Sequence, residues 1–503
     1  MYIAGQAEMQ LLDQHTIEKL GLPGTVLMEN AGAAVAMEIM KDFPNKGTKI
    51  LVLAGSGNNG GDGFVIARRL YDAGYDVRLM CCVGEEKIKG DARVHYNVYQ
   101  NRMLPVAECK TAYIKWADVL VDALLGTGGR GKVREPFHSV IKEVNGAGKF
   151  VYAVDIPSGV NADTGEVVDL AVLANKTVTF VLPKKGFYLQ QGPQYVGEIT
   201  CVDISVPPSL VEELQLALPK LIDEGMVREA LPKRLAHGHK GTFGHVLVVG
   251  GCRQYVGAPI YTAKAGFHSG AGLVTLAVPE SIYPMVATQS PECLLLPLRD
   301  EGGAISASAF TDDMIDFSSF NVVAFGPGLG RQTDGTSLLR HILKRLTGQT
   351  LIIDADGLYF SRALLKELVA YKGHVVFTPH PGEMSFLTGQ SVMEIEKSRL
   401  KIAEHFAKEH GILLVLKGHR SIVTTPAGEQ LINSYGNDAL GKGGSGDVLT
   451  GLIASFIAQG ASTKEAVIAA SYYHGNAAEH LGKEWSTYGV TPLDLIEYIR
   501  KTL

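Results

Sequence analysis

The sequence predicts an α/β protein made of two three-layer α/β/α domains, the first of them Rossmann-like. Short apolar runs that end in glycine alternate with helical patterns along most of the chain, which is typical of parallel strands covered by helices on both faces. This alternation stops near residues 206–208 and restarts near residue 244. A chain of 503 residues is also too long for one ordinary hydrophobic core. We therefore expect one domain over residues 1–215 and a second over residues 222–503.

The first domain begins with a segment, residues 6–42, in which leucine, isoleucine and valine recur at helical spacings. The run Lys49-Ile50-Leu51-Val52-Leu53-Ala54 follows and ends in glycine, as a buried parallel strand does. Further strands are expected at residues 77–83, 117–125, 150–155, 176–181 and 197–202, and helices at residues 91–101 and 136–145.

The second domain repeats the rhythm of strand, glycine and helix without repeating the sequence of the first. Its strands are expected at residues 244–249, 274–278, 322–325, 350–354, 374–378 and 413–417, and helices follow most of them.

Composition excludes several classes of function. Apolar residues make up 46% and charged residues 20% of the chain, as in ordinary globular proteins. A formal charge of −5 gives no reason to expect nucleic acid or an anionic membrane as a partner. No apolar run approaches the roughly 18 residues of a membrane span, and no signal peptide is evident. The six cysteines form no C-x-x-C pair, so we expect a reduced, cytoplasmic protein.

The most informative motif is Gly441-Lys442-Gly443-Gly444-Ser445-Gly446-Asp447, which runs directly into an apolar helical pattern. Backbone N–H groups at a helix N-terminus hold anions such as phosphate. Asp447 has two interpretations of about equal weight. It is either a base that removes a proton near a phosphoryl group or the N-cap of an ordinary helix.

The pattern G-x-G-x-x-G occurs three times, at residues 55–60, 126–131 and 441–446, and the first two copies each follow a predicted strand. Any single copy is explained by a tight turn that requires positive φ. Two copies at strand ends of one domain favour a dinucleotide-type site instead. The second copy nearly spells a P-loop, but Val133 stands where the metal-binding Ser or Thr should be.

Polar residues gather at the same expected sheet edge. Asp122 lies inside an apolar strand, which is costly unless it is paired or bound to a cation, and Asp155 and Ser158 follow the next strand. Oxygen ligands of this kind suit a hard cation better than zinc. We favour cation binding over the alternative that Asp122 only caps a loop.

In the second domain, Gly326-Pro327-Gly328-Leu329-Gly330 and Lys417-Gly418-His419-Arg420-Ser421 each follow a predicted strand. The second loop brings two cationic side chains and several N–H groups together. His380 lies between two prolines at another strand end. It either contacts a ligand or is an ordinary loop residue.

Taken as a set, these motifs resemble the bifunctional NAD(P)H-hydrate repair enzymes over nearly the whole chain. The first half is similar to NAD(P)H-hydrate epimerase at residues 58–63, 126–131 and 155–159. The second half is similar to the ribokinase-like NAD(P)H-hydrate dehydratase at residues 239–244, 257–259, 326–330, 378–383 and 441–447.

The resemblance implies that the first domain interconverts the R and S forms of hydrated NADH or NADPH (NADHX or NADPHX). The second domain would dehydrate the S form at the expense of ADP or ATP, with Mg²⁺ on the nucleotide. Potassium would serve the epimerase. We expect these small molecules as the ligands and a homo-oligomer as the assembly. The sequence does not decide between ADP and ATP or between the two hydrates.

The resemblance also implies roles for individual residues. Asp155 is the candidate acid/base of the epimerase, and Asp447 is the base of the dehydratase. Potassium would be bound by Asn59, Asp122 and Ser158. In the epimerase, the hydrate would be held by Asn58, Asn59, Gly60, Gly61, Asp62, Gly126, Thr127, Gly128, Gly129, Arg130, Gly131, Lys132 and Asp155. In the dehydratase, it would be held by Ala258, Gly328, His380 and Asp447. The adenine nucleotide would be contacted by Lys417, Gly418, His419, Arg420, Ser421 and Gly446.

Three other functions remain open from the residues alone. A ribokinase-like kinase fused to a nucleotide-binding domain would use the same glycine loop and Asp447, but its phosphorylated product would survive. A non-catalytic nucleotide sensor would bind without turnover, which the intact Asp155 and Asp447 argue against. A Rossmann dehydrogenase fits the glycine pattern but leaves the cation cluster unexplained.

Overall fold

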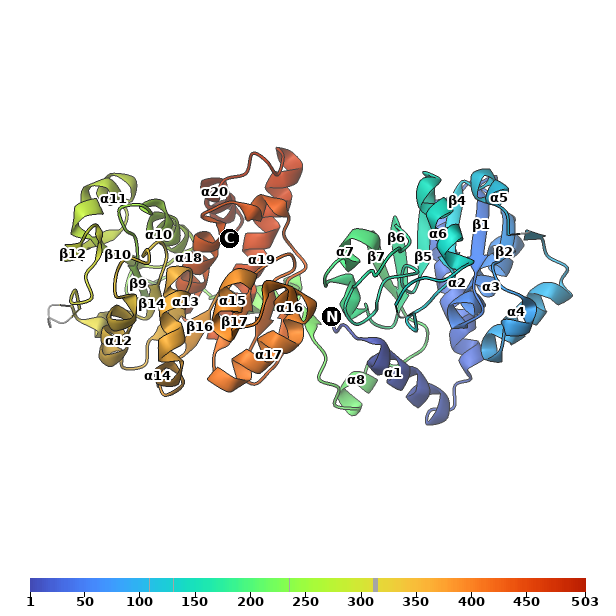
Figure 1. The fold of residues 1–503 in the computed structure, drawn as a ribbon, viewed down its shortest axis with the longest axis horizontal. Coiled ribbons are helices and arrows are strands. Elements are labelled where there is room, and N and C mark those ends of the chain that lie inside the picture. Colours follow the sequence, from blue (N-terminus) through green and yellow to red (C-terminus); the bar gives the residue numbers. More distant parts are fainter. Residues whose placement is uncertain (108, 130, 235, 311–314) are drawn as a thin grey trace. The chain divides into compact units, whose positions relative to one another are not determined.

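The structure, a computed structural model, describes residues 1–107, 109–129, 131–234, 236–310 and 315–503 of the chain (Figure 1). The chain divides into two compact units, Met1–Leu218 and Pro219–Leu503, each with its own sheet and its own hydrophobic core. Among the described residues, no helix is long and apolar enough to cross a membrane.

The sheet of the first unit has seven described strands in the order β3-β2-β1-β4-β5-β6-β7, and all its pairings are parallel. From β1 the chain adds β2 and then β3 on one side, and it then returns to add β4 on the other side of β1. Ligands of open α/β sheets bind at such a reversal, outside the carboxyl ends of the strands. The strands are β1 Lys49–Ala54, β2 Asp76–Cys81, β3 Val106–Ala107, β4 Val119–Ala123, β5 Phe150–Val154, β6 Lys176–Phe180 and β7 Glu198–Val202.

Helices cover both faces of this sheet, because alternate residues of a strand point to opposite faces. Ile50 and Val52 of β1 pack in one core with residues of α1, α2, α3 and α4, whereas Leu51 and Leu53 pack in the other with α5 and α6. The helices are α1 Gln6–Glu18, α2 Gly24–Asp42, α3 Asn58–Asp72, α4 Gly90–Asn101, α5 Thr111–Trp116, α6 Phe137–Gly146, α7 Gly192–Tyr195 and α8 Leu210–Glu213.

The second unit has a ten-stranded sheet in the order β11-β10-β9-β14-β15-β16-β17-β18-β19-β8. The pairings around β18 are antiparallel and the other pairings of this sheet are parallel. The order again reverses, here between β9 and β14. The strands are β8 Lys220–Leu221, β9 His245–Val249, β10 Leu273–Pro279, β11 Leu294–Leu298, β14 Val322–Phe325, β15 Thr350–Ile353, β16 Val375–Phe377, β17 Leu413–Leu416, β18 Ile422–Thr424 and β19 Gln430–Ile432, with a small ribbon of β12 Asp300–Glu301 and β13 Ala304–Ile305.

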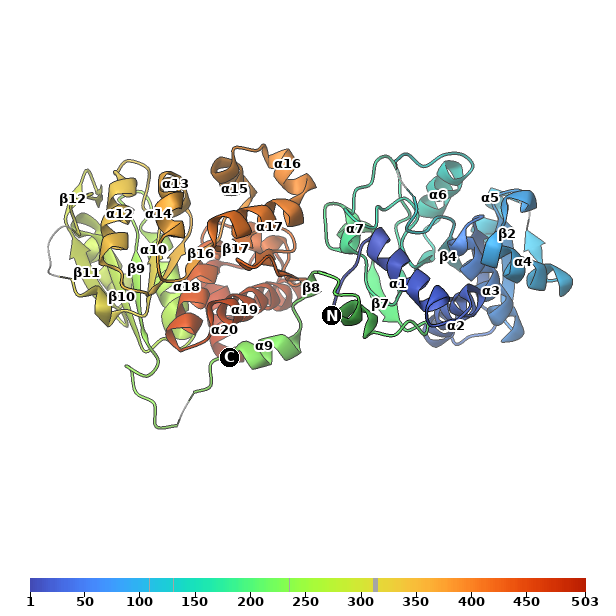
Figure 2. The ribbon, with the colours of Figure 1, turned by 90° about the horizontal axis from the view of Figure 1, so that it is seen from below.

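Two helical layers enclose this sheet as well. Figure 2 shows α12 to α17 on one side of it and α9, α18, α19 and α20 on the other. The second group packs with Val246 and Val248 of β9 in one core. The helices are α9 Glu224–Ala230, α10 Gly257–His268, α11 Tyr283–Gln289, α12 Gly335–Arg345, α13 Asp356–Ser361, α14 Leu365–Val369, α15 Pro381–Thr388, α16 Val392–Lys397, α17 Arg399–His410, α18 Ser445–Ala458, α19 Thr463–Glu484 and α20 Pro492–Thr502.

The expected α/β/α architecture is confirmed in both units, and the expected buried strands are present within a few residues of their predicted ends. The helical segment expected over residues 6–42 is two helices. Gly21 has a φ of 79°, and Pro23 is the N-cap of α2, so the chain turns between them. Short strands such as β3 and β8 were not expected, because two residues carry no detectable periodicity.

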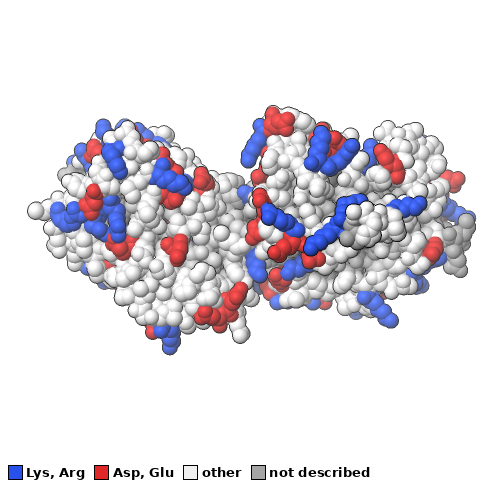
Figure 3. Space-filling view, turned by 180° about the vertical axis from the view of Figure 1, so that it is seen from behind, with Lys and Arg blue, Asp and Glu red and all other residues white. Residues whose placement is uncertain are grey.

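Charged side chains of both signs are interspersed over the face seen in Figure 3. No broad area of a single sign covers the part of either unit that this view shows.

Candidate active sites

A cavity of about 550 Å³ lies at the reversal of strand order in the first unit. It is bounded by the loops that follow β1 and β4 and by residues of α1 and α2. Many residues predicted to hold a dinucleotide line it together. They are Asn58, Asn59, Asp62, Gly126, Thr127, Gly128, Gly129 and Asp155.

The first glycine loop is shaped by close backbone contacts. A Cβ added to Gly55 would lie 1.9 Å from the carbonyl oxygen of Leu124, and one added to Gly60 would lie 2.0 Å from the carbonyl oxygen of Gly55. Glycine is therefore required at both positions. The loop begins α3 at Asn58, so the positive end of that helix dipole faces the cavity.

The predicted cation ligands form one buried cluster. The Asp122 carboxylate accepts hydrogen bonds from the backbone N–H of Ser158 at 2.8 Å and from its hydroxyl at 2.7 Å. Asn59 donates its amide to the carbonyl of Leu125 at 3.1 Å, and its Oδ1 is buried without a hydrogen-bond partner among the described residues. Burial raises the pKa of Asp122 to about 6, although the Ser158 bonds oppose that rise. The cluster thus holds an amide oxygen without a donor beside a carboxylate that, among the described residues, has no positively charged partner.

Asp155 is held by a buried lysine that the sequence reasoning missed. The Lys184 ammonium group, only 1% exposed, bonds to Oδ1 of Asp155 and donates to Thr179 Oγ1 at 2.9 Å. The backbone N–H of Phe180 also donates to Asp155, at 3.2 Å. Asp155 has a φ of 64°, which is uncommon for a residue with a side chain. Three donors, from Lys184, Thr179 and Phe180, thus hold one carboxyl group at the cavity wall.

Some predicted residues lie elsewhere. Gly60 and Gly61 are buried inside α3 and do not line the cavity. Gly131 and Lys132 line a neighbouring cavity of about 240 Å³, which shares Leu125 with the first. Arg130 lies outside the described residues.

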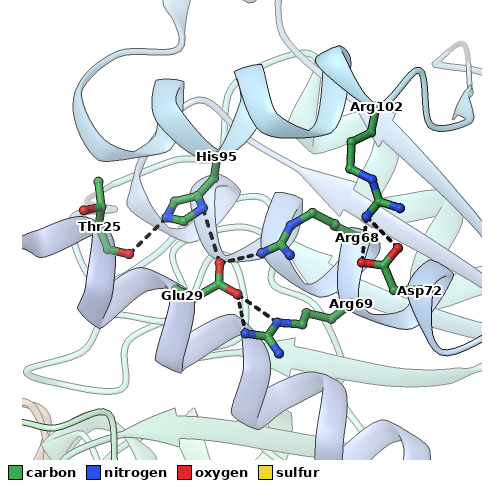
Figure 4. A network of polar contacts seen from close by, with 7 residues as sticks. All are labelled: Thr25, Glu29, Arg68, Arg69, Asp72, His95 and Arg102. Atoms are coloured by element: carbon green, nitrogen blue, oxygen red, sulfur yellow. Dashed lines mark hydrogen bonds and ion pairs between the residues drawn. The ribbon is translucent and has the colours of Figure 1, made fainter.

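A polar network braces the wall of this cavity (Figure 4). Glu29 of α2 forms ion pairs with Arg68 and Arg69 of α3, each at 2.5 Å, and lies 3.6 Å from Nδ1 of His95 on α4. The other ring nitrogen of His95 contacts the carbonyl of Thr25 at 3.1 Å. Burial alone would raise the pKa of Glu29, but the hydrogen bonds from both arginines outweigh it and lower that pKa. The three helices that supply one side of the site are thereby tied together.

The second unit holds a cavity of about 810 Å³ at its own reversal of strand order. Three of the four residues predicted to bind the hydrate there line it, namely Ala258, Gly328 and Asp447. The loops after β9, β14 and β15 and the start of α18 supply its walls.

Asp447 is the third residue of α18, and the N-cap of that helix is Gly444. The interpretation of Asp447 as an ordinary N-cap is therefore wrong. Gly444 has a φ of 98°, and a Cβ there would lie 2.8 Å from the ring of Tyr261. The glycines let the chain turn tightly into α18, whose first-turn N–H groups have no acceptors within the helix.

Burial, and next the nearby Asp354, raise the pKa of Asp447 to about 8, while Lys417 opposes the rise. The ammonium group of Lys417 lies 2.8 Å from Asp354 Oδ1. Thr450 of α18 donates to the other oxygen of Asp354, also at 2.8 Å. A Cβ added to Gly446 would lie 3.2 Å from the Lys417 ammonium group. Lys417 therefore lies beside the start of α18, whereas the sequence placed it only in a nucleotide loop.

His380 is the N-cap of α15 and does not line the large cavity. Its Nδ1 accepts hydrogen bonds from the N–H groups of Gly382 and Glu383, at 3.0 and 3.2 Å. Burial and the charge of Lys417 lower the pKa of His380, so the ring is neutral and carries its proton on Nε2. Burial raises the pKa of Glu383. The sequence reasoning assigned no role to Glu383 or to Asp354.

A buried arginine, which the sequence did not indicate, donates hydrogen bonds to the backbone around the loop Lys417–Ser421. Arg399, the first residue of α17, donates to the carbonyls of Leu416 and Lys417, both at 3.1 Å, and of His419 at 2.9 Å. Its side chain is 5% exposed. One guanidinium group thus satisfies three carbonyls around a sharp turn. No periodic pattern marks such a residue in a sequence.

Comparisons with known proteins match both halves of the chain. Residues 246–501 match the family model described as NAD(P)H-hydrate dehydratase, and residues 24–186 match the model described as YjeF-related protein N-terminus. Among solved structures, the ADP/ATP-dependent NAD(P)H-hydrate dehydratase of Bacillus subtilis, co-crystallized with ATP/Mg²⁺, is 29% identical. The match covers 56% of this chain and 97% of that one, with a TM-score of 0.49.

Relatives of full length are also similar to this chain. The bifunctional NAD(P)H-hydrate repair enzyme Nnr of Moorella thermoacetica is 36% identical over 99% of this chain and 96% of its own length. The protein of the same name from Pyrobaculum aerophilum is 37% identical over 99% of this chain and 97% of its own length. Both halves thus match in the order in which the two cavities occur, and the chain belongs to the family of bifunctional NAD(P)H-hydrate repair enzymes.

Proposed function

We propose that the cavity of the first unit epimerises hydrated NADH or NADPH and that the cavity of the second unit dehydrates the S form with ADP or ATP. One observation carries the proposal. Each unit presents a glycine loop, the start of a helix and a buried carboxylate at the reversal of its strand order. We assign residues 1–215 to the epimerase and residues 222–503 to the dehydratase. The epimerase unit converts the R form into the S form, which is the substrate of the dehydratase unit.

Potassium fits the epimerase cluster. The unpartnered Oδ1 of Asn59, the carboxylate of Asp122 and the hydroxyl of Ser158 supply the oxygen ligands that a large hard cation takes. A bound cation would offset the charge of buried Asp122. It would also anchor α3 to the loop after β5, between which the hydrate lies.

In the dehydratase, Asp447 acts on the hydroxyl group of the hydrate. Asp447 accepts the hydroxyl proton while the oxygen attacks the terminal phosphoryl group of the nucleotide. The rest of the nucleotide leaves as AMP when the donor is ADP, or as ADP when the donor is ATP. Expulsion of the new phosphate, with loss of a ring proton, then forms the double bond of NADH or NADPH. The N–H groups at the start of α18 and the Lys417 ammonium group stabilise the developing charge.

Magnesium fits the nucleotide end of this site. Glu383 and Asp447 are carboxyl groups whose pKa values are raised by burial and by neighbouring carboxylates. Glu383, with water and the phosphates, would hold Mg²⁺, which supplies positive charge to the transferring phosphoryl group. The loop Lys417–Ser421 holds the nucleotide that carries the ion.

The deciding experiment mixes the purified protein with both hydrate epimers, with and without ADP or ATP, and follows NADH absorbance. Full recovery of NADH from the R and S mixture is expected only with nucleotide. Recovery of only the S half would contradict epimerisation. Accumulation of a stable phosphorylated product without NADH would instead identify a kinase.

A further inference from the structure

The N-terminal segment is paired with the segment that carries Lys184. The N–H of Ala4 donates to the carbonyl of Pro183 at 3.0 Å, and the N–H of Lys185 donates to the carbonyl of Ala4 at 2.8 Å. Glu8 of α1 forms an ion pair with Lys185 at 2.6 Å. Helix α1 therefore has a fixed position beside Lys184, the partner of Asp155.

This position brings Asp13 of α1 to the wall of the epimerase cavity. Its Oδ1 is buried and has no hydrogen-bond partner among the described residues. Two other carboxyl groups line the same cavity, Asp155 after β5 and Asp62 of α3. The buried ammonium group of Lys184, after β6, lies within electrostatic reach of Asp13. Burial and then the negative charge of Asp155 raise the pKa of Asp13 to about 6, and Lys184 opposes the rise.

Asp13 and Asp155 thus differ in the way that an acid and a base must differ. Lys184, Thr179 and the N–H of Phe180 all donate to Asp155, so one of its oxygens accepts three hydrogen bonds. No described donor reaches the buried oxygen of Asp13, so its protonated form is favoured by comparison. Both groups border one cavity of a size that admits a nicotinamide ring.

We propose that Asp13 is a second catalytic acid/base of the epimerase and exchanges one proton with the hydrated ring while Asp155 exchanges another. This inference rests on the proposed function of the cavity. It adds a residue on α1 to a site otherwise built from the carboxyl edge of the sheet.

Inversion at carbon 6 requires one bond to that carbon to break and to form again on the other face. Ionised Asp155 takes the proton of the hydroxyl group, whose electron pair becomes the second bond of an aldehyde. The electrons of the bond between carbon 6 and the ring nitrogen move to the nitrogen, which takes the proton of neutral Asp13. Rotation of the aldehyde and the reverse transfers close the ring as the other epimer, so protons and electrons balance.

The test replaces Asp13 by Asn and follows interconversion of the separated epimers by chromatography without nucleotide. We expect kcat to fall by about 10²- to 10⁴-fold, with hydrate affinity nearly unchanged and dehydration of the S form unaffected. The matched control is Glu18→Gln on the same helix. Glu18 is exposed and bonds only to Gln14 among the described residues, at 3.0 Å, so this variant should keep full epimerase activity.

A pH profile separates a catalytic role from a structural one. In the wild-type protein, kcat/KM for epimerisation should fall as pH rises through the pKa of Asp13, because its proton is lost, and Asp13→Asn should lack this limb. Should Asp13→Asn fail to fold, the Asp13→Glu variant replaces it in the test. If kcat/KM of Asp13→Glu falls over the same pH range as that of the wild-type protein, the inference is overturned. Unchanged epimerisation by Asp13→Asn would also overturn it, whereas failure of the wild-type protein to interconvert the epimers would overturn the proposed function itself.

Discussion

Asp447 lies in the first turn of α18, which begins two residues earlier. Four charged or titratable side chains lie within its electrostatic reach, namely Asp354, Lys417, Glu383 and Asp356. Burial raises the pKa of Asp447 to about 8, which keeps its proton affinity close to that required of a base at neutral pH. The same carboxylate in open solvent would be a far weaker base.

The pH dependence of dehydration follows from this pKa. Asp447 must be ionised to accept the hydroxyl proton, so kcat/KM for the S hydrate should rise with pH and reach half of its plateau near pH 8. At one unit below that pKa, the rate should be about tenfold below its plateau. Initial rates of NADH formation between pH 6 and 9 measure this. A flat profile would show that Asp447 does not act as the base, as would a wild-type rate for Asp447→Asn.

Asn59 offers a second test at the scale of one residue. Its buried Oδ1 has no protein partner among the described residues, and a cation ligand would explain that. Asn59→Ala should raise the potassium concentration that half-saturates epimerisation by tenfold or more. Potassium should also raise the melting temperature of the wild-type protein, because a ligand that binds only the folded state stabilises it. Equal potassium responses of wild type and variant would contradict the assigned ligand.

At the scale of elements, polar side chains of the surrounding helices fix the backbone near each cavity. Glu29, Arg68 and His95 join α2, α3 and α4 around the epimerase cavity (Figure 4). In the dehydratase, Arg399 joins α17 to the turn after β17. These polar residues act on the site through the backbone that they position.

Replacing Arg399 by Met should loosen the loop Lys417–Ser421. Each buried carbonyl left without a donor costs about 1–3 kcal/mol, so the loop would rearrange to reach water. We expect the KM for ADP or ATP to rise about tenfold or more, with a smaller loss of kcat and partial rescue by Arg399→Lys. Lys401→Met, at an exposed position of the same helix, is the matched control. An unchanged KM in Arg399→Met would contradict the positioning role.

At the scale of the whole molecule, the chain consists of two compact units. Each has its own sheet, and the division falls between Leu218 and Pro219. The short strand β8 pairs with β19 and therefore belongs with the second unit, although it lies only two residues after the division.

Cutting the chain there should give two working proteins. Residues 1–218 alone should interconvert the epimers, and residues 219–503 alone should dehydrate only the S form. Circular dichroism and the two separate assays measure folding and activity. A second pair, cut after residue 222 so that β8 is removed from its sheet, should leave the dehydratase less stable. Loss of either activity on clean separation at residue 218 would show that the units depend on each other.

The sequence by itself determined the α/β/α architecture, the buried strands and the glycine loops that border the two cavities. These features are local: an apolar run, a glycine turn and the following helix lie next to one another in the chain. Asp447, Asp122 and Ser158 were found for this reason, since each stands in or beside such a motif. The resemblance of the motifs then led to the correct family.

Only the tertiary structure decided which side chains meet. Lys184 follows Asp155 by 29 residues and Asp354 precedes Lys417 by 63, yet each pair is in contact. Asp13 and Arg399 lie on helices whose sequence pattern gives no sign of a buried charge. The physical reason is that burial and charge pairing depend on chain segments brought together by folding. The proton affinities of Asp13 and Asp447, and hence the acid and base roles proposed for them, are set by those contacts.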